Sequence, residues 1–412
     1  MWATVALALA LAAIAPAPVQ AQQDVAAFTD RIYGVITTED GDTYEGFIRW
    51  TDNEGSWSDF LNGQKSLDPE HLEEARELSG EERRRSLRIF GLRFLFGNDG
   101  PDQASSGLRF GHIASIERGR GGRADIHLTS GDVVALEGGS SDIGSGMELT
   151  IEDPARGTVE VGWRDLERVE FREAPGDARP RARRLYGTLR TQEGHSFTGF
   201  IAWDSDEILT TDVLDGEEKG RDREIPFANI GAIQRFSSSG ARVLLTNGEE
   251  IVLKDSNDVD EDNRGIIVAD PQLGQVTVDW DEFLDITFQP APADAAPRAR
   301  FDGGRRLRGT VETADGRQLR GAIRWDNDEE FTWEALDGEA GFVEMDVELG
   351  NVASIRRLDD DSAEVTLRDG RVFEMSGSND VDDHNKGIFV TDSSGDASLV
   401  TWEDFRLVRF DG

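Results

Sequence analysis

The stretch GTLRTQEGHSFTGFIAW, residues 187–203, returns as GVITTEDGDTYEGFIRW at residues 34–50 and as GTVETADGRQLRGAIRW at residues 309–325. In every copy glycines stand at the same spacing, and an isoleucine and a tryptophan alternate at the end. Apolar residues at every second position are typical of a strand with one buried face. The central glycine supplies the positive φ of a tight turn. The chain is therefore expected to hold three tandem repeats, at residues 26–172, 183–288 and 305–410.

A second pattern closes each repeat: VGWRDLERVEF, VDWDEFLDITF and VTWEDFRLVRF, which end at Phe171, Phe288 and Phe410. A weaker form of the same pattern stands in the middle of each repeat, as at Phe110, His112, Ile113 and Ile116. Six matches in all predict six modules of about 50 residues, two in each repeat.

The closing segment, with an aromatic residue, a short polar turn and a last strand, resembles the one-turn helix and final strand of SH3-like and Sm-like small β-barrels. The fold class expected is therefore all-β, with each repeat a pair of small SH3-like β-barrel modules. A barrel of about 50 residues buries only a modest part of its surface, so the two modules of a repeat are expected to pack as one domain. No ligand or binding residue follows from the resemblance, because no motif matches residue by residue.

Repeat 1 carries an insertion at about residues 66–107, where a helix is expected to begin at Asp68 and Pro69. A basic and apolar stretch follows, with Arg88, Phe90, Arg93 and Phe94 as candidate binding residues for a membrane surface or a partner. The alternative is that the insertion covers an open edge of repeat 1. Residues 173–182 and 289–304, rich in Pro, Ala and Arg, are expected to be stiff linkers.

Composition narrows the function classes. A net charge of −38, from 82 acidic and 44 basic residues, argues against a nucleic-acid partner, because phosphate binding needs a basic footprint. Residues 1–21 have the apolar run and the small residues of a secretory signal, so a periplasmic or secreted protein is expected. The mature chain has no stretch apolar enough for a transmembrane segment. It has no cysteine for disulfides.

An aspartate-rich loop, SNDVDEDNRGI at residues 256–266, returns as SNDVDDHNKGI at residues 378–388. Its oxygen-bearing side chains suit a hard cation such as calcium. The alternative is a turn in which side chains cap backbone NH groups. The candidate metal ligands are Asp258, Asp260, Asp262, Asn263, Asp380, Asp382, Asp383 and Asn385.

Trp57 and Trp333 are the candidate exposed recognition residues, because they stand near one another in the repeat alignment without matching. No catalytic motif is present, and the five histidines occupy unrelated repeat positions. We therefore expect a non-enzymatic exported binding or scaffold protein, whose partner is a protein or an envelope polymer. The alternatives are a calcium-stabilised structural protein of the envelope or matrix, and a hydrolase acting on cell-wall material.

Overall fold

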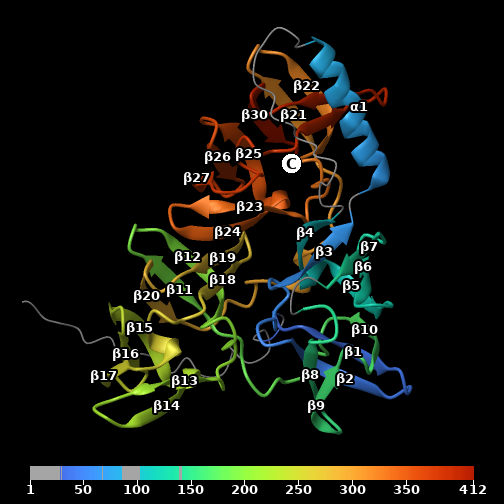
Figure 1. Ribbon diagram of the computed structural model, residues 1–412. Coiled ribbons are helices and arrows are strands. Elements are labelled where there is room, and N and C mark those ends of the chain that lie inside the picture. Colours follow the sequence, from blue (N-terminus) through green and yellow to red (C-terminus); the bar gives the residue numbers. More distant parts are fainter. Residues whose placement is uncertain (1–27, 29, 67, 86–102, 139–141) are drawn as a thin grey trace, which may run out of the picture.

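The computed structural model describes residue 28 and residues 30–66, 68–85, 103–138 and 142–412 (Figure 1). Antiparallel strands form one sheet of 10 strands and a second sheet of 20 strands, which confirms the all-β prediction. The expected export signal at residues 1–21 lies outside the described residues, and so do Arg88, Phe90, Arg93 and Phe94.

Repeat 1 forms the 10-stranded sheet and contains the helix α1 and the one-turn 3-10 helix η1. Its elements are β1 (Tyr33–Thr38), β2 (Thr43–Trp50), β3 (Phe60–Ser66), α1 (Pro69–Arg85), β4 (Gln103–Arg109), η1 (Phe110–His112), β5 (Ile113–Arg118), β6 (Arg123–Leu128), β7 (Val133–Glu137), β8 (Glu148–Asp153), β9 (Gly157–Gly162) and β10 (Leu166–Phe171).

Repeats 2 and 3 share the 20-stranded sheet. Repeat 2 consists of β11 (Tyr186–Thr191), β12 (Ser196–Ala202), β13 (Val213–Glu217), β14 (Asp222–Pro226), η2 (Phe227–Asn229), β15 (Ile230–Ser237), β16 (Gly240–Leu245), β17 (Glu250–Lys254), η3 (Asn257–Val259), β18 (Ile266–Asp270), β19 (Gly274–Val278) and β20 (Phe283–Phe288). After η4 (Arg298–Arg300), repeat 3 consists of β21 (Arg308–Thr313), β22 (Gln318–Arg324), β23 (Ala335–Ala340), β24 (Val343–Glu348), η5 (Leu349–Asn351), β25 (Val352–Arg357), β26 (Ser362–Leu367), β27 (Val372–Ser376), β28 (Ile388–Thr391), β29 (Ala397–Val400) and β30 (Phe405–Phe410).

The two halves of a repeat exchange strands. In repeat 1 the sheet order is β4-β3-β7-β6-β5-β10-β1-β2-β8-β9. The first two strands of the first half, β1 and β2, pair with β10 and β8 of the second half. The first two strands of the second half, β6 and β7, pair with β5 and β3 of the first half. Each half therefore completes the hydrogen bonding of the other.

This exchange corrects the expectation of small closed barrels made from contiguous modules. The strands instead continue through β5–β10, and through the equivalent pairs β15–β20 and β25–β30, into large open sheets. A strand has two edges for hydrogen bonding. When one edge pairs with the other half of the repeat, that edge cannot close a barrel within its own half. The alternation and the turns are local features of the sequence, whereas the choice of partner strand is not local.

The repeated glycines are required where strands lie close together. Gly34 pairs with Gly46 across the first hairpin. A Cβ on Gly46 would lie 2.1 Å from the carbonyl oxygen of Glu152, and the equivalent contact at Gly199 is 2.2 Å from that of Ala269. The central glycine, Gly194 in repeat 2, has φ of 94°, as a tight turn requires.

The repeats are joined by strands and by buried ion pairs. Strand β19 of repeat 2 pairs with β24 of repeat 3 (Figure 1). Arg109 of repeat 1 is 1% exposed; its guanidinium donates to the carbonyls of Asp270 and Pro271 in repeat 2 and lies 3.0 Å from Glu348 in repeat 3. The side chain of Arg184 donates to both carboxylate oxygens of Asp59. These buried charges are paired across repeats, as burial requires.

The two predicted linkers pack against repeat 1 rather than standing free. Ala296 and Phe301 are buried with the apolar core of repeat 1. The ring of Phe301 meets that of His112 edge-on at 5.1 Å, and the backbone NH of Gly303 donates to Nδ1 of His112. The linkers therefore add to the contact between repeats.

The insertion helix α1 lies along repeat 3, where Figure 1 shows it beside β22. Glu74 on α1 accepts a hydrogen bond of 2.6 Å from the guanidinium of Arg324, and His71 lies 3.6 Å from Glu330. The helix thus contacts repeat 3, whereas β4, at the end of the insertion, pairs with β3 of repeat 1. Among the described residues no helix has both the length and the apolar character that crossing a bilayer requires.

Candidate functional site

Two loops meet at the end of the first hairpin of each repeat. We name the tryptophan loop the five residues that begin with the repeated tryptophan: Trp50–Glu54, Trp203–Glu207 and Trp325–Glu329. We name the aspartate loop the segment at residues 256–265 in repeat 2 and 378–387 in repeat 3, with Asp142 at the equivalent place in repeat 1. In every repeat the indole Nε1 donates to the main-chain carbonyl of the aspartate loop, at Asp142, Asp258 and Asp380.

The same three aspartates tie the aspartate loop to the third strand of the repeat. A carboxylate oxygen of each accepts a hydrogen bond from a backbone NH at the start of that strand: Asn62 to Asp142, Asp215 to Asp258 and Asp337 to Asp380, at 2.6 to 2.8 Å. The three aspartates Asp142, Asp258 and Asp380 are 2% to 5% exposed. The buried aspartates therefore position loops, whatever else they do.

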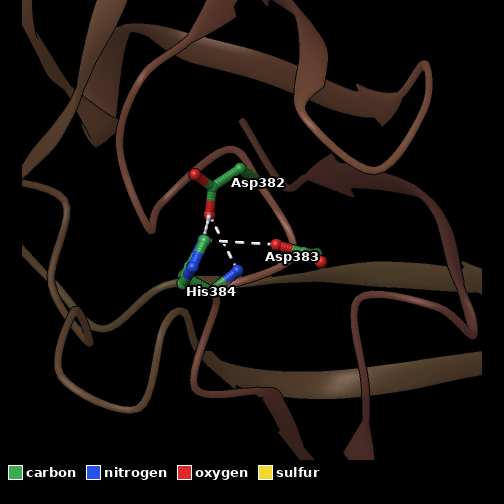
Figure 2. Close-up of side chains that lie close together, drawn as sticks. All are labelled: Asp382, Asp383 and His384. Atoms are coloured by element: carbon green, nitrogen blue, oxygen red, sulfur yellow. Dashed lines mark hydrogen bonds and ion pairs between the residues drawn. The ribbon is translucent and has the colours of Figure 1, made fainter. Parts of the chain in front are cut away.

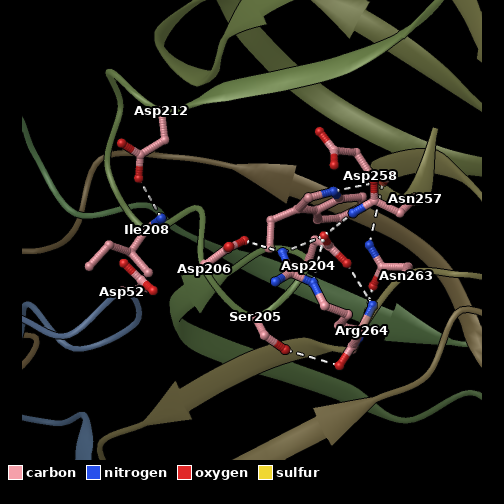
Figure 3. A network of polar contacts seen from close by, with 12 residues as sticks. Asp52, Asp204, Ser205, Asp206, Ile208, Asp212, Asn257, Asp258, Asn263 and Arg264 are labelled. Carbon is pink, nitrogen blue, oxygen red and sulfur yellow. Dashed lines mark hydrogen bonds and ion pairs between the residues drawn. The ribbon is translucent and has the colours of Figure 1, made fainter. Parts of the chain in front are cut away.

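A second carboxylate, nine residues after each tryptophan, closes the turn that follows the tryptophan loop. Asp212 accepts from the backbone NH groups of Ile208 and Leu209 at 2.8 and 2.9 Å (Figure 3). The equivalent acceptors are Asp59, which caps Gly55 and Ser56, and Glu334, which caps Glu330 and Phe331. These contacts satisfy NH groups that the turn leaves without a strand partner.

In repeat 2 an arginine of the aspartate loop binds the tryptophan loop. The backbone NH of Arg264 donates to Oδ1 of Asp204, and its guanidinium donates to Oδ2 of Asp204 and to Asp206 (Figure 3). Asn257 also donates to Asp204. Asp204 is 0% exposed, so the arginine supplies the positive charge that its burial requires.

Repeat 3 has a lysine in the same place. The backbone NH of Lys386 donates to Asp326, and its ammonium group lies 2.7 Å from Oδ2 of Asp326 and 3.6 Å from Asp328. Asn379 donates to Asp326 as Asn257 does to Asp204. Repeat 1 has Thr51 in place of the aspartate, and the hydroxyl of Thr51 donates to Glu54. The charged arrangement therefore belongs to repeats 2 and 3.

Burial raises the pKa values of the carboxyl groups between the two loops. Loss of hydration and then repulsion from Asp258 raise the pKa of Glu207 to about 9. Loss of hydration raises the pKa of Asp258 to about 6, against the hydrogen bond from Asp215. In repeat 3, burial raises the pKa of Asp326 to about 7 even though Lys386 lowers it. Burial therefore favours the protonated form of these carboxyl groups over the charged form.

The residues predicted as metal ligands separate into two groups. Asp258 and Asp380 are buried, and an oxygen of Asp380 lies within 4.8 Å of oxygens of Asp326 and Glu329. The remaining six make local turns or lie on the surface. Asp260 accepts from the NH of Asp262, Asn263 from that of Gly265, Asp382 from that of His384 and Asn385 from that of Gly387, whereas Asp262 and Asp383 are exposed.

Asp382 and Asp383 do gather around one further side chain, that of His384. Figure 2 shows both carboxylates directed at the imidazole, whose Nδ1 lies 3.2 Å from each. The histidine side chain is 80% exposed. The three side chains meet on the loop surface, where such contacts contribute little to stability.

Sequence reasoning missed the members of the clusters that come from the tryptophan loop. Asp326 and Glu329 lie more than 50 residues before Asp380, so no short-range spacing connects them. The signal was the shared pattern Trp-Asp-x-Asp-Glu at residues 203–207 and 325–329. Only the strand exchange brings that pattern against the aspartate loop.

Trp57 and Trp333, expected to be exposed, are 1% and 2% exposed. The ring of Trp57 meets that of Phe171 edge-on and lies 5.2 Å from the guanidinium of Arg298. The ring of Trp333 stacks on Phe331 at 6.1 Å. Both indoles contribute to packing where the repeats and a linker meet.

A polar pocket of about 220 Å³ lies between repeat 1 and repeat 3. Its lining includes Asp337 and Asp346, which face one another across β23 and β24 and share a hydrogen bond. Burial, then repulsion from Asp337, raise the pKa of Asp346 to about 8. Lys65 also lines the pocket and donates to Glu334 at 2.5 Å.

The chain matches no protein-family model, no curated protein and no solved structure. Its function is therefore argued from its own residues.

Proposed function

We propose that this chain is a non-enzymatic binding or scaffold protein, exported to the periplasm or secreted, whose partner is a protein or an envelope polymer. The observation that carries the proposal is the junction at Arg109, which contacts all three repeats through one buried guanidinium. Such a junction holds the outer surfaces of the repeats at fixed positions.

A buried guanidinium is a demanding contact. Removing one partner of a buried ion pair leaves an uncompensated charge, which costs about 3 to 5 kcal/mol. Separating repeat 1 from repeat 3 would therefore leave the charges of Arg109 and Glu348 without their partner. Arg371 of repeat 3 adds a hydrogen bond of 2.6 Å to Asp270 of repeat 2.

Rigidity bears on how repeated modules bind. Several similar binding surfaces raise the affinity only when all of them can contact the partner at the same time. In a rigid protein, the fixed positions of the surfaces decide whether they can do so. A partner with a regular repeat, such as an envelope polymer, suits such a platform. The charge of −38 continues to argue against nucleic acid.

We propose further that each strand-exchanged unit is related to the SH3-like barrel. The support is the one-turn 3-10 helix that precedes the fifth strand of the first half in every repeat: η1 before β5, η2 before β15 and η5 before β25. The closing segments at the end of each repeat form a turn at the corresponding place.

If the chain were a hydrolase, Asp337 and Asp346 would be its candidate catalytic carboxyl pair. Their pocket of about 220 Å³ is smaller than the cavities of about 300 to 1,000 Å³ that hold most small ligands. A polymer chain would not enter it without movement of repeat 1. This pocket is therefore too small to favour the hydrolase alternative.

The test is binding of residues 22–412 to isolated cell-wall polymer and to purified exported proteins, with the soluble fraction assayed for released fragments. The proposal predicts saturable binding without fragment release, and binding weakened about tenfold or more in Arg109→Met, because loosened repeats no longer engage together. Fragments that accumulate with time, and disappear in Asp346→Asn, would establish the hydrolase instead.

A further inference from the structure

The carboxylates between the two loops of repeat 3 form a buried cluster that its hydrogen bonds do not account for. Asp326, Glu329 and Asp380 are 0%, 6% and 4% exposed, and one oxygen from each lies within 4.8 Å of the others. Asp326 and Glu329 come from the tryptophan loop, and Asp380 comes from the aspartate loop.

One oxygen of the cluster has no hydrogen-bond partner among the described residues. This is Oε2 of Glu329, which is fully buried. Oδ1 of Asp326 accepts from the backbone NH of Lys386, and Oδ2 of Asp380 accepts from that of Asp337. A carboxylate oxygen has two lone pairs, so these oxygens retain a free acceptor position.

The local charge is not balanced. Asp328 also borders the cluster, and the ammonium group of Lys386 pairs with Asp326 and lies 3.6 Å from Asp328. Lys65 hydrogen-bonds to Glu334 and to the carbonyl of Asp328, and its charge also attracts Glu329, but Glu334 takes up part of that charge. Unpaired buried charge is costly, so the cluster requires either protons or a cation.

The three oxygens are close enough to contact one divalent cation. Calcium binds oxygen at about 2.3 to 2.6 Å, so ligands of one ion lie no more than about 5 Å apart, as these oxygens do. The ligands here are all carboxylates, and carboxylate oxygens bind hard cations such as calcium in preference to softer metals. We propose that Asp326, Glu329 and Asp380 bind one divalent cation, with calcium the best match.

Repeat 2 has a comparable group, since oxygens of Asp204, Asp206 and Glu207 lie within 4.8 Å of one another and Oε2 of Glu207 also has no hydrogen-bond partner among the described residues. The two repeats differ in the basic residue beside the acids. In repeat 2 the guanidinium of Arg264 donates to both Asp204 and Asp206, at 2.6 and 2.5 Å, and so bridges the two carboxylates. The ammonium group of Lys386 hydrogen-bonds to Asp326 and leaves Asp328 at 3.6 Å. An arginine fork occupies the space between two acids, whereas a lysine is a single point of charge.

The first experiment measures the melting temperature of residues 22–412 in EDTA and in millimolar calcium. The proposal predicts a rise of several degrees in calcium for the parent chain. It predicts the same rise for Glu207→Gln, the matched position in repeat 2, and for Asp382→Asn with Asp383→Asn on the loop surface. Glu329→Gln, which keeps the shape and removes the charge, is expected to lose the rise.

A second readout does not depend on stability. Trp325 donates to the carbonyl of Asp380, so its indole lies beside the proposed ion and should sensitise the luminescence of bound terbium. Calcium should displace terbium from the parent, and Asp380→Asn, which still accepts from Asp337, should bind terbium at least tenfold more weakly. A parent that shows neither response, or a Glu329→Gln chain that responds as the parent does, would overturn the proposal.

Discussion

At the scale of single residues, most of the acidic side chains singled out by their repetition position backbone. The carboxylate of Asp212 accepts from two NH groups, and that of Asp258 accepts from one while its carbonyl receives the indole of Trp203. The tryptophans and turn formers could be identified from the sequence because their pattern is local. The partners of Asp258 could not, since they lie some 40 to 55 residues away.

Removing the carboxylate of Asp212 should destabilise the chain. Asp212→Ala leaves the NH groups of Ile208 and Leu209 without their acceptor, and each buried unsatisfied group costs about 1 to 3 kcal/mol. We expect a loss of about 2 kcal/mol in the free energy of unfolding measured with urea. Asp262→Ala, on the exposed part of the aspartate loop, should change it by less than about 0.5 kcal/mol. Equal effects from the two variants would contradict the capping role.

The contribution of Asp30 to stability should depend on pH with the opposite sign to that of a carboxylate paired with a cation. Burial raises the pKa of Asp30 from 3.8 to about 6, so the folded chain binds this proton more tightly than the unfolded chain does. Its contribution to stability therefore falls as the pH rises from 3.8 to about 6, and stays low above that.

Replacing Asp30 by asparagine should therefore stabilise the chain at pH 7, by about 1 to 3 kcal/mol, and by progressively less as the pH is lowered toward 4. Urea unfolding of both chains across this pH range measures the difference. A gain that is independent of pH would show that the effect comes from packing and not from the charge.

At the scale of elements, the exchange of strands between half-repeats explains both what the sequence predicted and what it did not. Alternation and turn glycines identify the hairpins β1–β2, β11–β12 and β21–β22. They say nothing of which strand pairs with β2 on its other edge, because β8 offers the same alternation as any contiguous neighbour. The prediction of closed barrels fails for this reason. The predicted metal ligands all come from the aspartate loop, whereas the buried cluster also includes Asp326 and Glu329 of the tryptophan loop.

The glycines of the hairpin provide a test of this packing. In Gly199→Ala the new methyl group would lie 2.2 Å from the carbonyl oxygen of Ala269 on β18, the strand supplied by the other half. Backbone must move to relieve the clash, so we expect a loss of about 1 to 3 kcal/mol or more. Gly162→Ala, where the nearest atom would be 4.0 Å away, is the matched control and should be nearly neutral. A neutral Gly199→Ala would contradict the exchanged pairing at β12.

At the scale of the whole molecule, the three repeats form one body. Arg109, the ion pair of Arg184 with Asp59, and the pairing of β19 with β24 join them, and the linkers add apolar contacts. The number of repeats could be read from the sequence, since identical spacings recur. Their arrangement could not, because arginine and acidic residues are abundant, and nothing in their spacing shows which of them are buried between repeats.

The most direct test of the scaffold is to measure distances between repeats by pulsed EPR. The chain has no cysteine, so spin labels can be placed at will; Asp42, Asn247 and Arg317 are exposed positions in repeats 1, 2 and 3. Cysteine pairs at 42 and 247, and at 42 and 317, should each give one narrow distance distribution, which broadens in Arg109→Met. Broad or multiple distributions in the parent chain would contradict the claim that the repeats are held as one rigid platform.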